Sequence, residues 1–218
     1  MSDPSMDKIL TVGIVISFLV SFSALLWLIL RTFTFGKPEL KSKAQGDGKK
    51  GICYAFVQGM MPWEKESAKR HLITYFSGFL YHGGIFLGIF YVFTLVFNIT
   101  LPSLILLGIQ IVIPAAAAAG IGLFIKRNSV AYMRSISTPD DYAANLLVDV
   151  FLIFAFLHSL MPGVRPILLI ITIIMFLYIP LGKIRHCFFF FYSRILFGIF
   201  FGRRGVFPRK QNQRRIEV

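Results

Sequence analysis

The chain contains four histidines, and all four lie within or at the edge of long apolar segments: His71, His82, His158 and His186. An ionisable side chain inside a membrane is energetically costly, so such residues are expected to serve a function. Imidazole nitrogens bind haem iron, and histidines on neighbouring helices can hold one haem between them. The histidines are therefore the first candidates for chemistry in this chain.

The spacing of two histidines suggests how haems would be arranged. His71 and His82 are eleven residues apart, which in a continuous helix is about three turns and about 16 Å along the axis. Both imidazoles would then face the same side, and Gly78 on that side would leave room for a flat ring. We expect two haem b groups, each held by two histidines: an inner pair of His71 and His186, and an outer pair of His82 and His158. The outer pair requires helix tilt to match its depths.

Each of the other polar residues near these histidines has two possible roles. Asp149, within an apolar segment, could move protons for a quinone such as menaquinone, or bond a neighbouring helix. Basic residues near the inner pair could neutralise haem propionates or anchor the chain at lipid headgroups, and they are Lys183, Arg185 and Arg194. Arg165 is a propionate candidate on the outer side. A membrane histidine can likewise do no more than hydrogen-bond a neighbouring helix.

The composition predicts the elements that must position these residues. Hydrophobic residues make up 56% of the 218-residue chain, charged residues only 15%, and the mean hydropathy is +0.71. About 20 apolar residues are needed to cross the hydrocarbon. The sequence therefore predicts an all-α integral membrane bundle in a single membrane domain, with five transmembrane helices at about 9–30, 72–97, 101–125, 142–160 and 167–190.

The basic residues predict the orientation of these helices. All Lys and Arg residues except Lys8 and Arg165 fall in the 31–71 loop, the 126–141 loop or the segment from 182 onward. The positive-inside rule then places the N-terminus outside and the C-terminus in the cytoplasm. The 31–71 loop would include an interfacial segment, and 192–218 would be a basic cytoplasmic tail. We attribute the charge of +13 to the lipid bilayer and not to nucleic acid.

The two cysteines and the absence of repeats exclude other classes. Cys53 and Cys187 form no CxxC or CxxCH motif, which argues against covalently attached haem and against an iron–sulfur cluster held by this chain. A transporter would be expected to show inverted repeats or paired broken helices, and none is recognisable. The main alternative is a haem-free membrane anchor or assembly subunit.

Two stretches resemble a known family. They are MPWEKESAKRHLITYFSGFLYHGGIF at 61–86, and YIPLGKIRHCFFFFYSRILFG followed by FGRRGVFP within 178–208. These stretches resemble the cytochrome b (gamma) subunit of respiratory nitrate reductase. They are still more similar to the membrane subunits of sulfate-reducer redox complexes, namely the high-molecular-weight cytochrome complex, the type II cytochrome c3 complex and the sulfite-reduction-linked complex.

The resemblance implies a b-type haem subunit of an anaerobic respiratory complex with other membrane subunits. Electrons would pass between a quinol or a periplasmic multihaem cytochrome c and a cytoplasmic iron–sulfur subunit. By position, the family ligands match His71, His82 and His186. His158 departs from the pattern, because the family's fourth ligand lies near the outer end of the last helix, where 166–170 holds no histidine.

Overall fold

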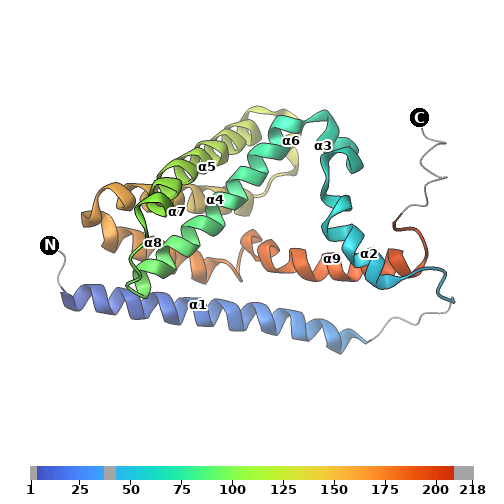
Figure 1. Cartoon of the computed structure of the whole chain (residues 1–218), viewed down its shortest axis with the longest axis horizontal. Coiled ribbons are helices and arrows are strands. Elements are labelled where there is room, and N and C mark those ends of the chain that lie inside the picture. The colour runs from blue at the N-terminus through green and yellow to red at the C-terminus, as the bar shows by residue number, and fades with distance from the viewer. Residues whose placement is uncertain (1–3, 37–42, 209–218) are drawn as a thin grey trace. The chain divides into compact units, whose positions relative to one another are not determined.

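The computed structural model describes residues 4–36 and 43–208, and in these residues every regular element is helical (Figure 1). The long helices are α1 (Pro4–Thr32), α4 (Leu72–Val96), α5 (Ser103–Ser129), α7 (Pro139–Leu160), α8 (Arg165–Tyr178) and α9 (His186–Arg203). The shorter ones are α2 (Gly48–Phe56), α3 (Glu66–Arg70) and α6 (Ala131–Ile136), with 3-10 turns η1 (Phe33–Phe35), η2 (Gln58–Met60), η3 (Pro62–Glu64), η4 (Pro162–Val164) and η5 (Lys183–Arg185).

The predicted fold class is confirmed. Among the described residues, five helical segments are long and apolar enough to cross a membrane: Ser5–Phe35, Leu72–Val96, Ser103–Ser129, Pro139–Leu160 and Lys183–Arg203. The start of α7 shows why the chain enters a helix where it does. Thr138 is the N-cap, Pro139 takes the first helical position, and the Thr138 N–H donates to Asp141 Oδ2 at 2.8 Å.

The last apolar stretch differs from the prediction of one helix over 167–190. It is interrupted, because α8 ends at Tyr178 and α9 begins only at His186. Pro180 has no N–H to donate to a carbonyl one turn earlier, so the helical hydrogen bonds stop after Ile179, which is itself still helical. Gly182 then closes a turn by donating its N–H to the Tyr178 carbonyl at 2.9 Å. At about 1.5 Å per residue, the 14 residues of α8 reach about 21 Å and do not cross the hydrocarbon alone.

Two predicted segments have more structure than expected. The 31–71 loop carries α2, η2, η3 and α3 within its described part. The predicted tail at 192–218 begins inside α9, which continues to Arg203. Residues 209–218 and 37–42 lie outside the described residues.

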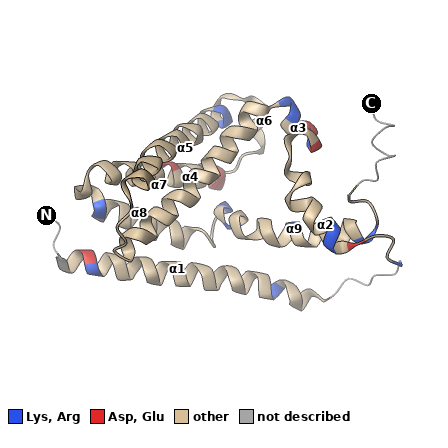
Figure 2. Cartoon of the chain, viewed as in Figure 1, with Lys and Arg blue, Asp and Glu red and all other residues tan. Residues whose placement is uncertain are grey.

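The chain divides into two compact units. The first unit comprises the residues up to Leu26 and Ile73–Arg185, and the second comprises Trp27–Leu72 and the residues from His186 onward. The core of the first unit lies between α4, α5, α7 and α8, where Phe151, Leu152, Ile113, Leu168 and Leu169 are fully buried. Along α5 the basic residues occupy only the end that leads to α6 (Figure 2).

Small residues bring the helices of the first unit together. A Cβ atom added to Gly84 of α4 would collide with the Cβ of Ala116 on α5. One added to Gly88 would lie 2.9 Å from the ring of Phe151 on α7. Membrane helices associate through such close contacts, since lipid supplies no hydrophobic drive between them. Within the alanine run at 115–119, the buried Ala116 and Ala117 therefore serve helix packing.

In the second unit, α2 packs along α9 through glycines on both helices. A Cβ on Gly202 would lie 2.6 Å from the Asp47 carbonyl oxygen and 2.7 Å from the Cα of Gly51. One on Gly198 would lie 2.5 Å from the Cα of Ile52. The two backbones can approach this closely only because these positions lack side chains, and Gly198 and Gly202 have the spacing of a small-xxx-small motif.

Candidate functional site

His82 lies on α4 with its side chain exposed and its tautomer set by its own helix. Its Nδ1 is 2.7 Å from the Gly78 carbonyl oxygen. A carbonyl only accepts hydrogen bonds, so Nδ1 must carry a proton, and in the neutral ring Nε2 holds the lone pair. This backbone bond is the usual way in which a protein orients a metal-binding imidazole. A Cβ added to Gly78 or Gly83 would meet nothing within 4 Å, so the helix surface beside His82 is open.

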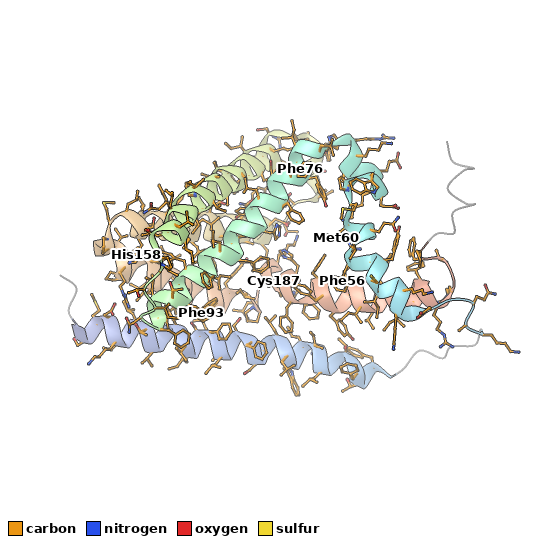
Figure 3. The ribbon with its side chains drawn as sticks, viewed as in Figure 1. Phe56, Met60, Phe76, Phe93, His158 and Cys187 are labelled. Carbon is orange, nitrogen blue, oxygen red and sulfur yellow. The ribbon has the colours of Figure 1, made fainter. Side chains whose placement is uncertain are left out.

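His158 is in a different environment, within the helices of the first unit (Figure 3). It is only 7% exposed, and its Nδ1 is 2.8 Å from the hydroxyl of Tyr91 on α4. The two rings also touch, with centroids 5.7 Å apart. A histidine with this burial and this partner joins α7 to α4. This environment fits the second expectation for a membrane histidine, a hydrogen bond to a neighbouring helix.

The structure does not bring His82 and His158 to one level. Tyr91 is nine residues beyond His82 on α4, a rise of about 13.5 Å. On α7, the residues near the level of His82 are Asn145 and Asp149, which meet Tyr81. One iron needs its two axial imidazoles at the same level. In this structure the two histidines of the expected outer pair are therefore not brought together.

His71 and His186 both belong to the second unit and are both exposed. His71 is the C-cap of α3, with φ −133° and ψ 55°, and α4 starts one residue later. The eleven-residue helical count from His71 to His82 therefore begins outside the helix, and the shared face inferred from it does not apply. His186 is the first residue of α9.

Asp149 belongs to a polar cluster in the first unit. Its carboxyl is 5% exposed, and its Oδ2 accepts from Asn145 Nδ2 at 2.9 Å. The same amide group lies 3.2 Å from the Tyr81 hydroxyl. Oδ1 of Asp149 is the buried side-chain oxygen without a hydrogen-bond partner among the described residues, and it lies against Gly120. The cluster joins α4, α5 and α7, which fits the expectation that Asp149 bonds to neighbouring helices.

Arg165 and Lys183 have carboxylate partners in the first unit. Arg165 Nε lies 2.7 Å from Asp7 Oδ1, which links the start of α8 to the start of α1. Lys183 Nζ lies 2.5 Å from Asp141 Oδ2. Arg127 also reaches Asp141, at 3.1 Å. Of the four proposed propionate partners, these two are therefore already neutralised.

The other two basic candidates are Arg185, at the end of η5, and Arg194, in the middle of α9. Arg185 is the exposed last residue of η5. Arg194 lies within α9, where its guanidinium stands over the rings of Phe190 at 5.5 Å and Phe197 at 6.0 Å. Arg194 is thus held by aromatic faces, and its charge has no carboxylate among the described ion pairs.

Sequence reasoning missed the partners of these groups. Tyr81 and Tyr91 are both buried on α4, and each contacts polar residues of α7. Tyr81 lies beside Asn145 and Asp149, and Tyr91 is bonded to His158. Two sequence patterns could have indicated these contacts. Tyr81 and Tyr91 are ten residues apart on one apolar segment, and Asn145 and Asp149 are four residues apart on another. Together they would have paired α4 with α7 at two levels.

No cluster of three or more His, Cys, Asp or Glu side chains suited to a metal ion occurs among the described residues, and both cysteines are free thiols. A haem needs only one or two histidines, so this finding bears on other metals. Comparison with protein-family models, with curated proteins and with solved structures finds no match to this chain.

Proposed function

We propose that the protein is a multi-pass membrane subunit that binds haem b and carries electrons within a larger redox complex. The observation that carries this proposal is His82, an exposed imidazole on an apolar helix whose Nδ1 is fixed by the Gly78 carbonyl. The donor set fits the group, because Nε2 holds the lone pair and the neighbouring Gly78 and Gly83 leave the helix surface open to a flat ring.

The residues of this chain would hold the group and adjust its electronic properties. His82 would supply an axial nitrogen, and its bond to Gly78 would keep the ring oriented and raise its basicity. Haem itself supplies one-electron chemistry. His71 and His186 in the second unit are the further ligand candidates, and Arg185 is a candidate for a propionate.

The partners that we propose are those that the sequence resemblance implies. We propose a quinol, menaquinol in an anaerobic membrane, or a periplasmic multihaem cytochrome c on the outer side, and an iron–sulfur subunit on the cytoplasmic side. Other membrane subunits would complete the complex in a bacterial or archaeal inner membrane. Since Arg165 already pairs with Asp7, it is not the group we assign to a quinone or a propionate.

A reduced-minus-oxidised visible spectrum with a haemochrome count tests the proposal on protein purified with its native partners. We expect wild type to contain haem and His82→Ala to lose one haem per chain, because the axial nitrogen is gone. His158→Ala is the matched control. It removes a histidine of the same unit that is buried and bonded to Tyr91, and we expect it to keep the wild-type haem count.

Two results would contradict this assignment. If wild type carries no haem, the electron-carrier function fails and the haem-free anchor remains. If His158→Ala loses the haem and His82→Ala keeps it, the protein binds haem but at another residue. His71→Ala and His186→Ala, measured in the same way, decide whether the second unit supplies ligands.

A further inference from the structure

The carboxyl group of Asp149 has one oxygen that the packing of the first unit does not use. Oδ2 accepts from Asn145 Nδ2 at 2.9 Å, whereas Oδ1 is buried and has no hydrogen-bond partner among the described residues. The residue is only 5% exposed, so bulk water does not surround that oxygen. Bonding to a neighbouring helix therefore accounts for Oδ2 and leaves Oδ1 unexplained.

No cation balances Asp149 in the part of the chain that the structure describes, where it takes part in no ion pair. The groups that face it are uncharged, and they are Tyr81 of α4, Gly120 of α5 and Asn145 of α7. On α8, which packs against α7, the buried residues are apolar apart from Thr172. An isolated carboxylate in such surroundings is so costly that the group takes up a proton instead.

The space around Oδ1 suits a proton and not a metal ion. A Cβ added to Gly120 would collide with Oδ1 and with the ring of Tyr81, so the backbone of α5 lies directly against the carboxyl group. Ca²⁺ and Mg²⁺ need about six or more oxygen ligands around them. A proton needs only the oxygen to which it binds.

Polar residues lead to Asp149 from the start of α7. Asp141, Asn145 and Asp149 are spaced four apart, so they lie along one face of the helix. Asp141 pairs with Arg127 at 3.1 Å, and the Arg127 side chain is 35% exposed, so water reaches this end. Asn145, one turn further along, is partly exposed. Only one turn of helix then separates Asp149 from a residue that water can touch.

The opposite direction along α7 is closed by apolar side chains. Phe151, Leu152 and Ala155 come next, and all three are fully buried. The next buried polar side chain on this helix is His158, nine residues from Asp149 and about 13.5 Å along the axis. A proton that reaches Asp149 therefore enters from the end that carries Asp141.

We propose that Asp149 is a proton-binding site that exchanges its proton with water through the start of α7. Oδ1 forms an O–H bond with a proton from that water, and release reverses the step, so neither an oxidant nor a reductant takes part. The Tyr81 hydroxyl, which donates to the Asn145 carbonyl at 3.3 Å, lies beside this approach. The site does not depend on the proposed haem, so either inference can fail without the other.

Infrared spectroscopy of the full-length protein in lipid vesicles tests the protonation, because a protonated carboxyl has a carbonyl band that an ionised one lacks. We expect this band in wild type at neutral pH and its loss in Asp149→Asn, which keeps the shape of the side chain. Glu66→Gln is the control, since Glu66 is exposed and paired with Arg70, and this variant should keep the band. An undiminished band in Asp149→Asn would overturn the site.

Transfer into heavy water tests the exchange and needs no variant. The band of wild type should shift as deuterium replaces the proton, and a band that never shifts would identify a fixed structural hydrogen and overturn the proposal. Asn145→Leu should slow the shift by about tenfold, the equivalent of one lost hydrogen bond on the way in. Ser159→Ala, at the far end of α7, should leave the rate unchanged.

Two further results would also contradict the proposal. If Ser159→Ala slows the shift and Asn145→Leu does not, the proton enters from the other end of the helix. If sodium ions added at constant pH abolish the band, the carboxyl group binds a metal cation in place of a proton.

Discussion

The two histidines of the first unit differ in what surrounds each imidazole. His82 is exposed and bonded to its own helix through Gly78, whereas His158 is buried and bonded across to Tyr91. The first arrangement orients an exposed imidazole from within one helix, and the second joins two helices. Residue type alone does not separate these roles, because both histidines lie in apolar stretches of similar length.

The Tyr91–His158 bond should contribute to the stability of the first unit. Tyr91→Phe removes the hydroxyl and leaves a buried imidazole nitrogen unsatisfied, at a cost of about 1–3 kcal/mol. We therefore expect a lower midpoint of thermal unfolding in detergent. Tyr132→Phe, at a position 60% exposed, is the control and should leave the midpoint unchanged. Equal midpoints for the two variants would show that the buried bond contributes nothing.

The candidate site could be predicted from the sequence only in its residue types. That histidines within apolar segments deserve attention follows from the cost of polar groups in lipid. Their pairing did not follow, because sequence spacing fixes the level of a residue on its own helix and says nothing of its level against the next one. His82 and His158 show this, since the bond of His158 to Tyr91 sets its level.

At the scale of elements, the sequence predicted a helix end correctly where a single residue type determines it. The start of α7 follows from Thr138 and Pro139, and both occupy the expected positions. The end of α8 was missed because the apolar run 167–191 outweighed Pro180 and Gly182 in the prediction. Hydropathy measures transfer into lipid, whereas a proline acts through the backbone, so an apolar stretch can be broken without any polar residue.

Contact between α2 and α9 depends on glycine. Gly198→Ala adds a Cβ that would lie 2.5 Å from the Ile52 Cα, so the helices must separate, at about 1–3 kcal/mol. We expect faster tryptic cleavage after Lys49 and Lys50 in folded protein, followed by mass spectrometry. Alanine favours helix over glycine by about 1 kcal/mol, which would act in the opposite direction.

Gly108→Ala separates these two effects. Gly108 lies in α5 with nothing within 4 Å of an added Cβ, so this variant gains helix propensity without a collision. Trypsin should cleave the Gly108→Ala variant no faster than it cleaves wild type. Unchanged cleavage of Gly198→Ala would mean that the α2–α9 contact tolerates a methyl group and is looser than the close backbone approach implies.

At the scale of the whole molecule, five segments can cross a membrane, and the basic residues predict which side each connection faces. In a background with Cys53 and Cys187 replaced by alanine, single cysteines at Asn98 and Gly163 should react with a membrane-impermeant maleimide added outside intact cells. A cysteine at Asn128 should react only after lysis. Reaction of all three from one side would contradict the alternating arrangement.

The glycine contact between α2 and α9 also bears on the order in which the protein is made. Gly51 leaves the ribosome long before Gly202, and at 5–20 residues per second the interval is roughly 8–30 s. The helices of the first unit from α4 to α8 are complete before that interval ends. During it, α2 has no α9 to lie against, so a chain that stops before Gly198 would display an unpaired helix with exposed glycine backbone.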